Sequence, residues 1–187
     1  MKLLDRRLED CLVLEREVFA DPRGWFYESF NQQDLGHVGI RDAFVQGNVS
    51  KSVGGTLRGL HFQQPKSQGK LISVIAGQIW DVAVDIRVGS PTFGQWAAVE
   101  LSGTNQRSFW IPAGFAHGFL ALSDEAIVSY FCTELYVREF DRAIAWDDPD
   151  IAIDWPVKEV LLSSKDASAA RLRDVPVELL PAYTGKS

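Results

Sequence analysis

Residues 78–87 alternate between two kinds of side chain with a period of two. Apolar side chains occupy one set of positions, namely Trp80, Val82, Val84 and Ile86. The positions between them are mostly polar: Ile79, Asp81, Ala83, Asp85 and Arg87. Successive side chains of a β-strand point to opposite faces. The period therefore predicts a strand with one apolar face and one mostly polar face.

Many other short segments have the composition of strands. The further segments predicted as strands are residues 11–14, 18–19, 43–50, 56–63, 97–101, 108–111, 118–122 and 127–134. Turn-forming residues separate them, as at positions 21–24, 54–55 and 102–105. Helical composition is limited to residues 31–39 and 164–172, the latter with Ser164 as its cap. This pattern favours an all-β sandwich or closed barrel with a short C-terminal helical segment.

Composition limits the classes of protein to be considered. The chain has 187 residues, 46% apolar and 24% charged, so we expect residues 1–187 to form a single domain with a sizeable core. Residues 1–10 carry six charged side chains and no apolar core of a signal peptide. No apolar run approaches the ~20 residues of a membrane span. We therefore expect a cytoplasmic protein without membrane contacts.

The net charge of −6 argues against a nucleic-acid-binding protein, which would carry basic stripes. An anionic small ligand would then need a local basic pocket. The two cysteines, Cys11 and Cys132, are too few for a disulfide framework or a thiolate metal cluster. We expect both to be reduced and to lie in or near the core.

The segment LRGLHFQ, residues 57–63, is the strongest candidate for chemistry. His61 has apolar neighbours, Arg58 lies three residues before it, and Lys70 follows a polar loop. Histidine is the usual general base near neutral pH, and a nearby cation binds phosphate or stabilises a developing oxyanion. The alternative is a structural histidine at a strand edge with Arg58 on the surface.

A metal site is the other chemistry that a β-barrel of this size could carry. Metal-binding β-barrels of this kind usually gather two or three histidines and a glutamate, two of the histidines being close together on one strand. Here His37, His61 and His117 are far apart in the sequence. We expect no metal and no other cofactor.

Several motifs, in order along almost the whole chain, resemble the dTDP-4-dehydrorhamnose 3,5-epimerase family. They are DxRGxFxE at 21–28, QxN at 46–48, LRGLHFQ at 57–63, GKL at 69–71, DVAVDIR at 81–87, SPTFG at 90–94, IPxGFAHGF at 111–119, WxD at 146–148 and SKD at 164–166. LRGLHF and PxGFAHGF together are highly specific. The resemblance implies a cupin-type jelly roll, a homodimer, catalysis without metal, and a role in dTDP-L-rhamnose synthesis.

The resemblance also implies roles for individual residues. His61 would be the base, Asp166 its orienting partner, Tyr130 the proton donor and Lys70 the group near the oxyanion. The alternatives are an exposed tail carboxylate for Asp166 and a barrel-filling aromatic for Tyr130. The positions that match ligand contacts are Arg23, Phe26, Glu28, Gln46, Asn48, Arg58, Lys70, His117, Tyr136, Asp141 and Lys165, with Tyr136 stacking on thymine. Asp81 would support the site from behind.

The implied substrate is a dTDP-4-keto-6-deoxyhexose. The implied reaction inverts C3 and C5 of dTDP-4-keto-6-deoxy-D-glucose through an enolate and gives dTDP-4-keto-L-rhamnose. Gly47, Leu135 and Asp141 depart from the usual family residues. They leave open an epimerase of one centre or a cupin acting on another dTDP-keto sugar, and a keto-isomerase fits less well. A non-catalytic sugar-binding cupin is the rival from a different class.

Overall fold

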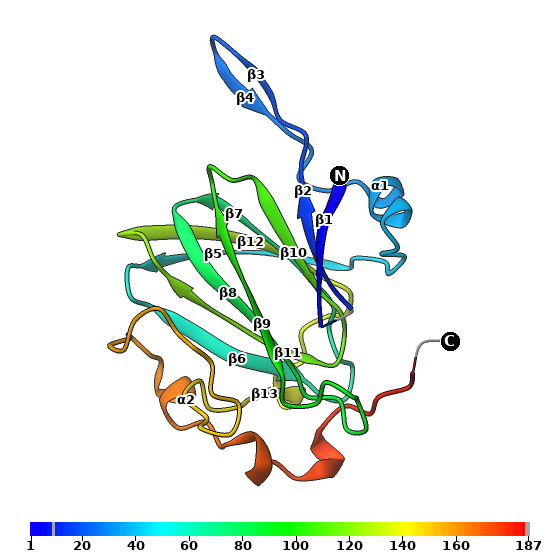
Figure 1. Ribbon diagram of the computed structural model, residues 1–187, viewed down its shortest axis with the longest axis vertical. Coiled ribbons are helices and arrows are strands. Elements are labelled where there is room, and N and C mark those ends of the chain that lie inside the picture. The colour runs from blue at the N-terminus through cyan, green and yellow to red at the C-terminus, as the bar shows by residue number, and fades with distance from the viewer. Residues whose placement is uncertain (9, 186–187) are drawn as a thin grey trace.

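The computed structural model describes residues 1–8 and 10–185, in which two antiparallel sheets face each other (Figure 1). The six-stranded sheet has the order β1 (Lys2–Arg7), β2 (Cys11–Glu15), β10 (Arg107–Ile111), β7 (Lys70–Ala76), β12 (Glu125–Cys132) and β5 (Gln46–Val53). The five-stranded sheet has the order β13 (Asp141–Ala143), β6 (Leu57–Gln63), β11 (Phe115–Ala121), β8 (Gln78–Asp85) and β9 (Trp96–Ser102). This is the predicted jelly-roll architecture.

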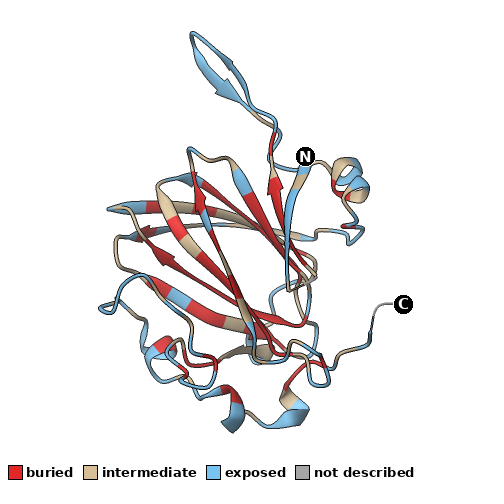
Figure 2. Ribbon diagram, in the orientation of Figure 1, coloured by how far each residue is buried: buried red, intermediate tan, exposed pale blue. Residues whose placement is uncertain are grey.

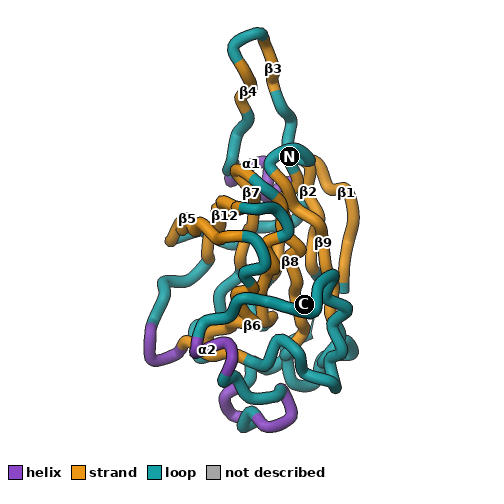
Figure 3. Tube along the Cα trace, turned by 90° about the vertical axis from the view of Figure 1, so that its left-hand side faces the viewer, coloured by secondary structure: helices purple, strands orange, loops and turns teal. Residues whose placement is uncertain are grey.

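The remaining elements are small. A hairpin of β3 (Phe19–Asp21) and β4 (Gly24–Phe26) extends beyond the barrel, as Figures 1 and 3 show. Two short α-helices are α1 (Gln32–His37) and α2 (Ser164–Ala167), and three 3₁₀ turns are η1 (Arg138–Phe140), η2 (Leu172–Asp174) and η3 (Val177–Leu179). None of the helices in the described part of the chain has the length and apolar character needed to span a bilayer.

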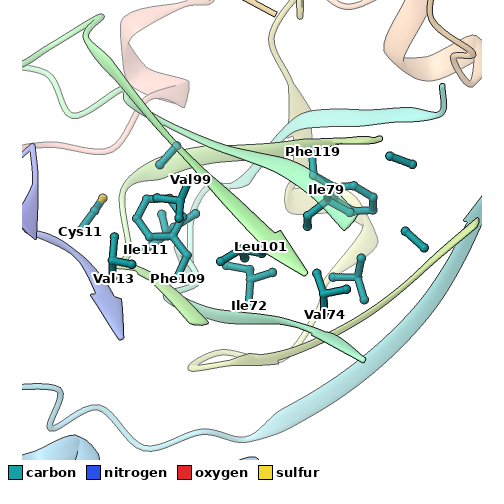
Figure 4. Close-up of a cluster of buried hydrophobic side chains, with 14 of the residues drawn as sticks. Cys11, Val13, Ile72, Val74, Ile79, Val99, Leu101, Phe109, Ile111 and Phe119 are labelled. Carbon is teal, nitrogen blue, oxygen red and sulfur yellow. The ribbon is translucent and has the colours of Figure 1, made fainter. Parts of the chain in front are cut away.

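The core lies between the two sheets. Figure 4 shows its side chains, among them Ile79, Leu101 and Phe109, all fully buried. Both cysteines are free and buried, as expected. Figure 2 shows that the buried residues follow the facing strands, whereas the β3–β4 hairpin is exposed. Burial of this apolar surface is the main favourable term in folding.

Strand β8 is buried on both faces. Ile79 and Ala83 point into the barrel, and Val82 and Val84 pack on the opposite side against the C-terminal segment, which includes Leu172. Two carboxylates of the mostly polar face, at positions 81 and 85, are also fully buried. The two faces of this alternating strand therefore meet two different buried regions, the barrel core and the layer under the C-terminal segment, rather than one core and the solvent.

The C-terminal helix is shorter than predicted. It covers only Ser164–Ala167, and its cap is Ser163, whose hydroxyl accepts a hydrogen bond from the Asp166 backbone N–H at 3.1 Å. The expected C-terminal helical segment is therefore present, but its predicted extent to residue 172 and its predicted cap, Ser164, are wrong. Beyond Ser168 the chain instead forms a bridge, with Ala170 pairing Ile144.

Candidate active site

A cavity of about 280 Å³ opens between the two sheets. Its lining residues are Gln46, Asn48, His61, Phe62, Gln63, Gln68, Lys70, Tyr130, Cys132, Tyr136, Asp141 and Lys165. A second cavity, of about 240 Å³, shares His61, Lys70 and Tyr130 and adds Arg58 and His117. Most of the predicted site residues are therefore brought together from both sheets.

A bulge between β6 and β11 lets Arg58 and His61 face the same space. His61 pairs with His117 and Arg58 pairs with Phe119, so three steps along β6 match two along β11. Residues three apart on a regular strand would point to opposite faces. The extra residue of the bulge shifts the alternation by one position, so that both side chains line the same cavity.

Two glycines permit this bulge. Gly59 has φ +130°, a conformation that side chains rarely adopt, and a Cβ there would lie 2.5 Å from the Cα of Gly118. A Cβ at Gly118 would in turn lie 2.7 Å from the Arg58 carbonyl oxygen. The glycines of LRGLHF and GFAHGF are thus required for the close approach of the strands that carry the two histidines.

His61 and Asp166 form a close pair. The Nε2 atom of His61 lies 2.5 Å from Oδ1 of Asp166, although the residues are 105 positions apart. The Asp166 side chain is only 3% exposed. Burial opposes its ionisation, but its hydrogen bond and charge interaction with His61 hold its pKa below the usual value. With Asp166 accepting from Nε2, Nδ1 is left as the nitrogen that can take a proton.

Lys70 and Tyr130 face His61 from the opposite sheet. Lys70 lies on β7 and is 8% exposed, and its ammonium has no hydrogen-bond or ion-pair partner in the described part of the chain. Burial lowers its pKa. Tyr130 lies on β12, and burial raises the pKa of its hydroxyl, an effect that Arg58 partly opposes. Tyr130 therefore keeps its proton at neutral pH, and Lys70 is available to a ligand.

A second His–Asp pair lies beside the first. Nε2 of His117 is 2.7 Å from Oδ1 of Asp81, whose carboxyl is fully buried. Burial raises the pKa of Asp81, whereas His117 lowers it. Oδ2 of Asp81 has no partner among the described residues. Asp81 thus lies behind His117 and lines neither cavity.

The other end of the cavity is built around Tyr136. Its hydroxyl lies 3.2 Å from Oδ2 of Asp141, which also accepts from the Lys165 ammonium at 2.5 Å. Gln46 accepts a hydrogen bond from the Tyr136 backbone N–H and donates to Asn48 Oδ1 at 3.0 Å. The side chains expected to bind the nucleotide therefore form one connected group.

Three predicted ligand contacts lie elsewhere in the same chain. Arg23 and Phe26 are on the β3–β4 hairpin, with the Arg23 side chain 90% exposed and paired with Asp21. They line a separate hollow on the hairpin rather than the barrel cavity. Glu28 follows the hairpin, is exposed and accepts weak hydrogen bonds from Asn31. Arg23, Phe26 and Glu28 therefore do not line the barrel cavity of their own chain.

Four residues that line this cavity were not predicted from the sequence: Phe62, Gln63, Gln68 and Cys132. Gln63 lies two positions after His61, and strand alternation alone could have placed it on the same face. Cys132 lies two positions after Tyr130 and is similarly placed. Gln68 belongs to a loop, for which the sequence carries no such signal. Among the described residues, no group of three or more His, Cys, Asp and Glu side chains is arranged to hold a metal ion.

The chain is similar to known proteins in sequence and in structure. A sequence profile of the dTDP-4-dehydrorhamnose 3,5-epimerase family matches residues 5–174. The dTDP-4-dehydrorhamnose 3,5-epimerase of Methanothermobacter thermautotrophicus is 53% identical over 181 residues, which cover 95% of this chain and 98% of the relative.

Solved structures are also similar. The Legionella pneumophila 3,5-epimerase RmlC, in complex with dTDP-4-keto-L-rhamnose, is 50% identical, with a TM-score of 0.96 over 98% of this chain and 99% of that one. The 3'-monoepimerase ChmJ of Streptomyces bikiniensis, in complex with dTDP-quinovose, is 34% identical, with a TM-score of 0.87 over 98% and 93% of the two chains.

The jelly roll and its cavity place the protein in the class of cupin-type sugar epimerases, which are isomerases. The chain belongs to the dTDP-4-dehydrorhamnose 3,5-epimerase family. The resemblance inferred from the sequence motifs is thereby confirmed.

Proposed function

We propose that the protein inverts C3 and C5 of dTDP-4-keto-6-deoxy-D-glucose to give dTDP-4-keto-L-rhamnose. The observation that carries this proposal is the placement of His61 and Tyr130, which line the same cavities from opposite sheets. A sugar ring held between them would have a base on one face and an acid on the other. A protein that only binds sugars would need neither group.

The chemistry follows from the C4 carbonyl, which acidifies the hydrogens on both neighbouring carbons. Nδ1 of His61 takes the proton from carbon, and the electron pair moves onto the C4 oxygen as an enolate. The Lys70 ammonium stabilises that negative charge. The enolate then collapses and its carbon takes the hydroxyl proton of Tyr130 from the opposite face. Proton exchange with water returns His61 and Tyr130 to their starting states.

Ligand binding uses the cationic groups of an otherwise acidic protein. Arg58, with its Nε atom held by Ser52 Oγ at 3.0 Å, and His117 would contact the diphosphate or the sugar attached to it. Lys165 lies at the other end, beside Tyr136, which would stack on thymine. Asn48 and Gln46 supply further polar contacts.

We also propose that the active unit is a homodimer acting in the cytoplasm, with residues 1–187 as one domain. The hairpin carries Trp25 and Phe26, which are 55% and 64% exposed, next to Arg23. It extends away from the barrel of its own chain (Figure 3). Transfer of this hairpin to a neighbouring subunit would cover these aromatic side chains and bring Arg23, Phe26 and Glu28 to a cavity that lacks them.

Mixing two impaired variants tests the dimer. We expect His61→Asn and Arg23→Ala chains to regain activity when they are unfolded, mixed and refolded together. Random pairing gives half mixed dimers with one intact site each, so about a quarter of wild-type activity should return if Arg23→Ala is inactive. Refolding each variant alone is the control. A fully active monomer in light scattering, or no gain on mixing, would contradict the shared site.

Incubation of the wild-type protein with dTDP-4-keto-6-deoxyglucose in D₂O tests the function itself. NMR should show deuterium at both C3 and C5 and the appearance of the L-configured sugar. Deuterium at one carbon only would identify a single-centre epimerase. Absence of exchange at both carbons would contradict the epimerase and favour the alternative, a non-catalytic sugar-binding cupin.

A further inference from the structure

Residues 134–137 form a strap between β12 and η1 that carries Tyr136 over the cavity. The strap has little packing to hold it, because Leu135 is 58% exposed and Tyr136 is 52% exposed. Its backbone is held instead by glutamine side chains. Gln68 Nε2 donates to the Glu134 carbonyl at 2.9 Å, and Gln46 Oε1 accepts from the Tyr136 N–H at 2.8 Å.

Gln63 makes two hydrogen bonds to the strap, whereas Gln68 and Gln46 make one each. Its Nε2 atom donates to the Leu135 carbonyl at 3.1 Å and to the Lys66 carbonyl at 2.7 Å. Its Oε1 atom accepts from the Val137 N–H at 2.8 Å. Gln63 is only 4% exposed. The buried amide of Gln63 thus forms hydrogen bonds with the strap on both sides of Tyr136 and connects the strap to the polar loop at Lys66.

The chemistry of the amide suits this position. A primary amide has two donor hydrogens and an acceptor oxygen, and here both donor directions and the acceptor are used. A carboxylate of the same shape would keep the contact with Val137 but would place an anion against two carbonyl oxygens. A methionine would fill the same volume and make none of the three bonds.

We infer that Gln63 is a positioning residue for the nucleotide end of the site. It fixes the strap so that the Tyr136 ring is held in place before the ligand arrives, which spares the ligand the cost of ordering it. The inference rests on the proposed function, because it takes thymine as the group that Tyr136 meets. Gln63 takes no part in the proton transfers between the sugar and His61 or Tyr130.

The test compares dTDP with inorganic pyrophosphate as ligands of Gln63→Met, by calorimetry. Loss of the clamp should weaken dTDP binding about 10- to 100-fold, since each hydrogen bond contributes modestly and tenfold corresponds to 1.4 kcal/mol. Pyrophosphate binding should change less than about twofold, because it does not reach Tyr136. In turnover, KM should rise in parallel with the dTDP dissociation constant, with kcat little changed.

Two further variants show whether the effect passes through Tyr136. Tyr136→Ala alone should weaken dTDP binding, and adding it to Gln63→Met should cause little further loss. Gln106→Met is the matched control: it removes a glutamine that bonds the Gly103 carbonyl and does not line the cavity. It should leave both ligands unaffected.

Unchanged dTDP affinity in Gln63→Met would overturn the inference. Equal weakening of dTDP and pyrophosphate, together with a fall in kcat, would also overturn it, because that pattern indicates general loss of structure. If Gln63→Met does not fold, the same dTDP and pyrophosphate titrations are made on Gln63→Glu, which keeps the acceptor for the Val137 N–H. Weaker binding of dTDP alone would then support the inference, and unchanged dTDP affinity would overturn it. Failure of the proposed function would appear separately, as wild-type protein that binds dTDP but does not exchange hydrogen at C3 or C5.

Discussion

Replacing His61 by asparagine is expected to abolish hydrogen exchange at both C3 and C5. Asparagine occupies a similar volume but cannot take a proton from carbon. One base is proposed for both centres, so the two exchange rates should fall together, by at least the ~10²–10⁴-fold that general base catalysis contributes. NMR in D₂O measures both rates in one sample.

Asp166→Asn should weaken exchange without removing the base. An amide in place of the carboxylate loses the charge that stabilises the imidazolium, and its NH2 group can donate to His61 and favour the wrong tautomer. The affinity for dTDP should stay the same, since Asp166 is buried behind His61 and does not line the cavity. Asp154→Asn, at an exposed carboxylate outside the cavity, is the control.

A contrary result for His61→Asn would be hydrogen exchange that persists at C3 or C5. That carbon would then require a different base.

The sequence predicts a strand where apolar and polar side chains alternate, or where turn-forming residues lie on both sides of a short apolar segment. Strand β8 was found for the first reason and β6 for the second. Strand β7, Lys70–Ala76, was missed, because its nearly continuous apolar run has no period of two. The sequence also could not show that both faces of β8 are buried, since the C-terminal segment that covers one of them is recognisable only in the folded chain.

The candidate site, like the fold, could be predicted from the sequence only in part. The motifs located His61, Arg58 and His117, but only the bulge at Gly59 explains how Arg58 and His61 face one cavity. Local sequence could not place Asp166 at His61, because the two residues are 105 positions apart, and the family resemblance did so instead. It could not reveal Gln63 as a clamp either, because all three of its partners are backbone atoms, which leave no mark in the side-chain pattern.

Tyr130→Phe is expected to separate the acid from the base. The variant keeps the ring and loses only the hydroxyl, which forms no hydrogen bond with any described residue, so the barrel packing should survive. His61 can still form the enolate. It then holds a proton that exchanges with solvent and can return it only to the face it came from. In D₂O the 4-keto sugar should therefore gain deuterium with retained configuration, while L-configured product falls ~10²–10⁴-fold.

The two outcomes distinguish an acid from a packing residue because the measurements respond to different steps. Deuterium in recovered substrate reports removal of the proton, whereas L-configured product reports delivery from the opposite face. A structural defect would lower both, and so would loss of Lys70, since the enolate itself would be harder to form. Inversion of C5 by Tyr130→Phe at near the wild-type rate would mean that water or another side chain supplies the proton. Tyr130 would then be an aromatic residue that fills the barrel, the alternative that its position on β12 with Val128 and Cys132 left open.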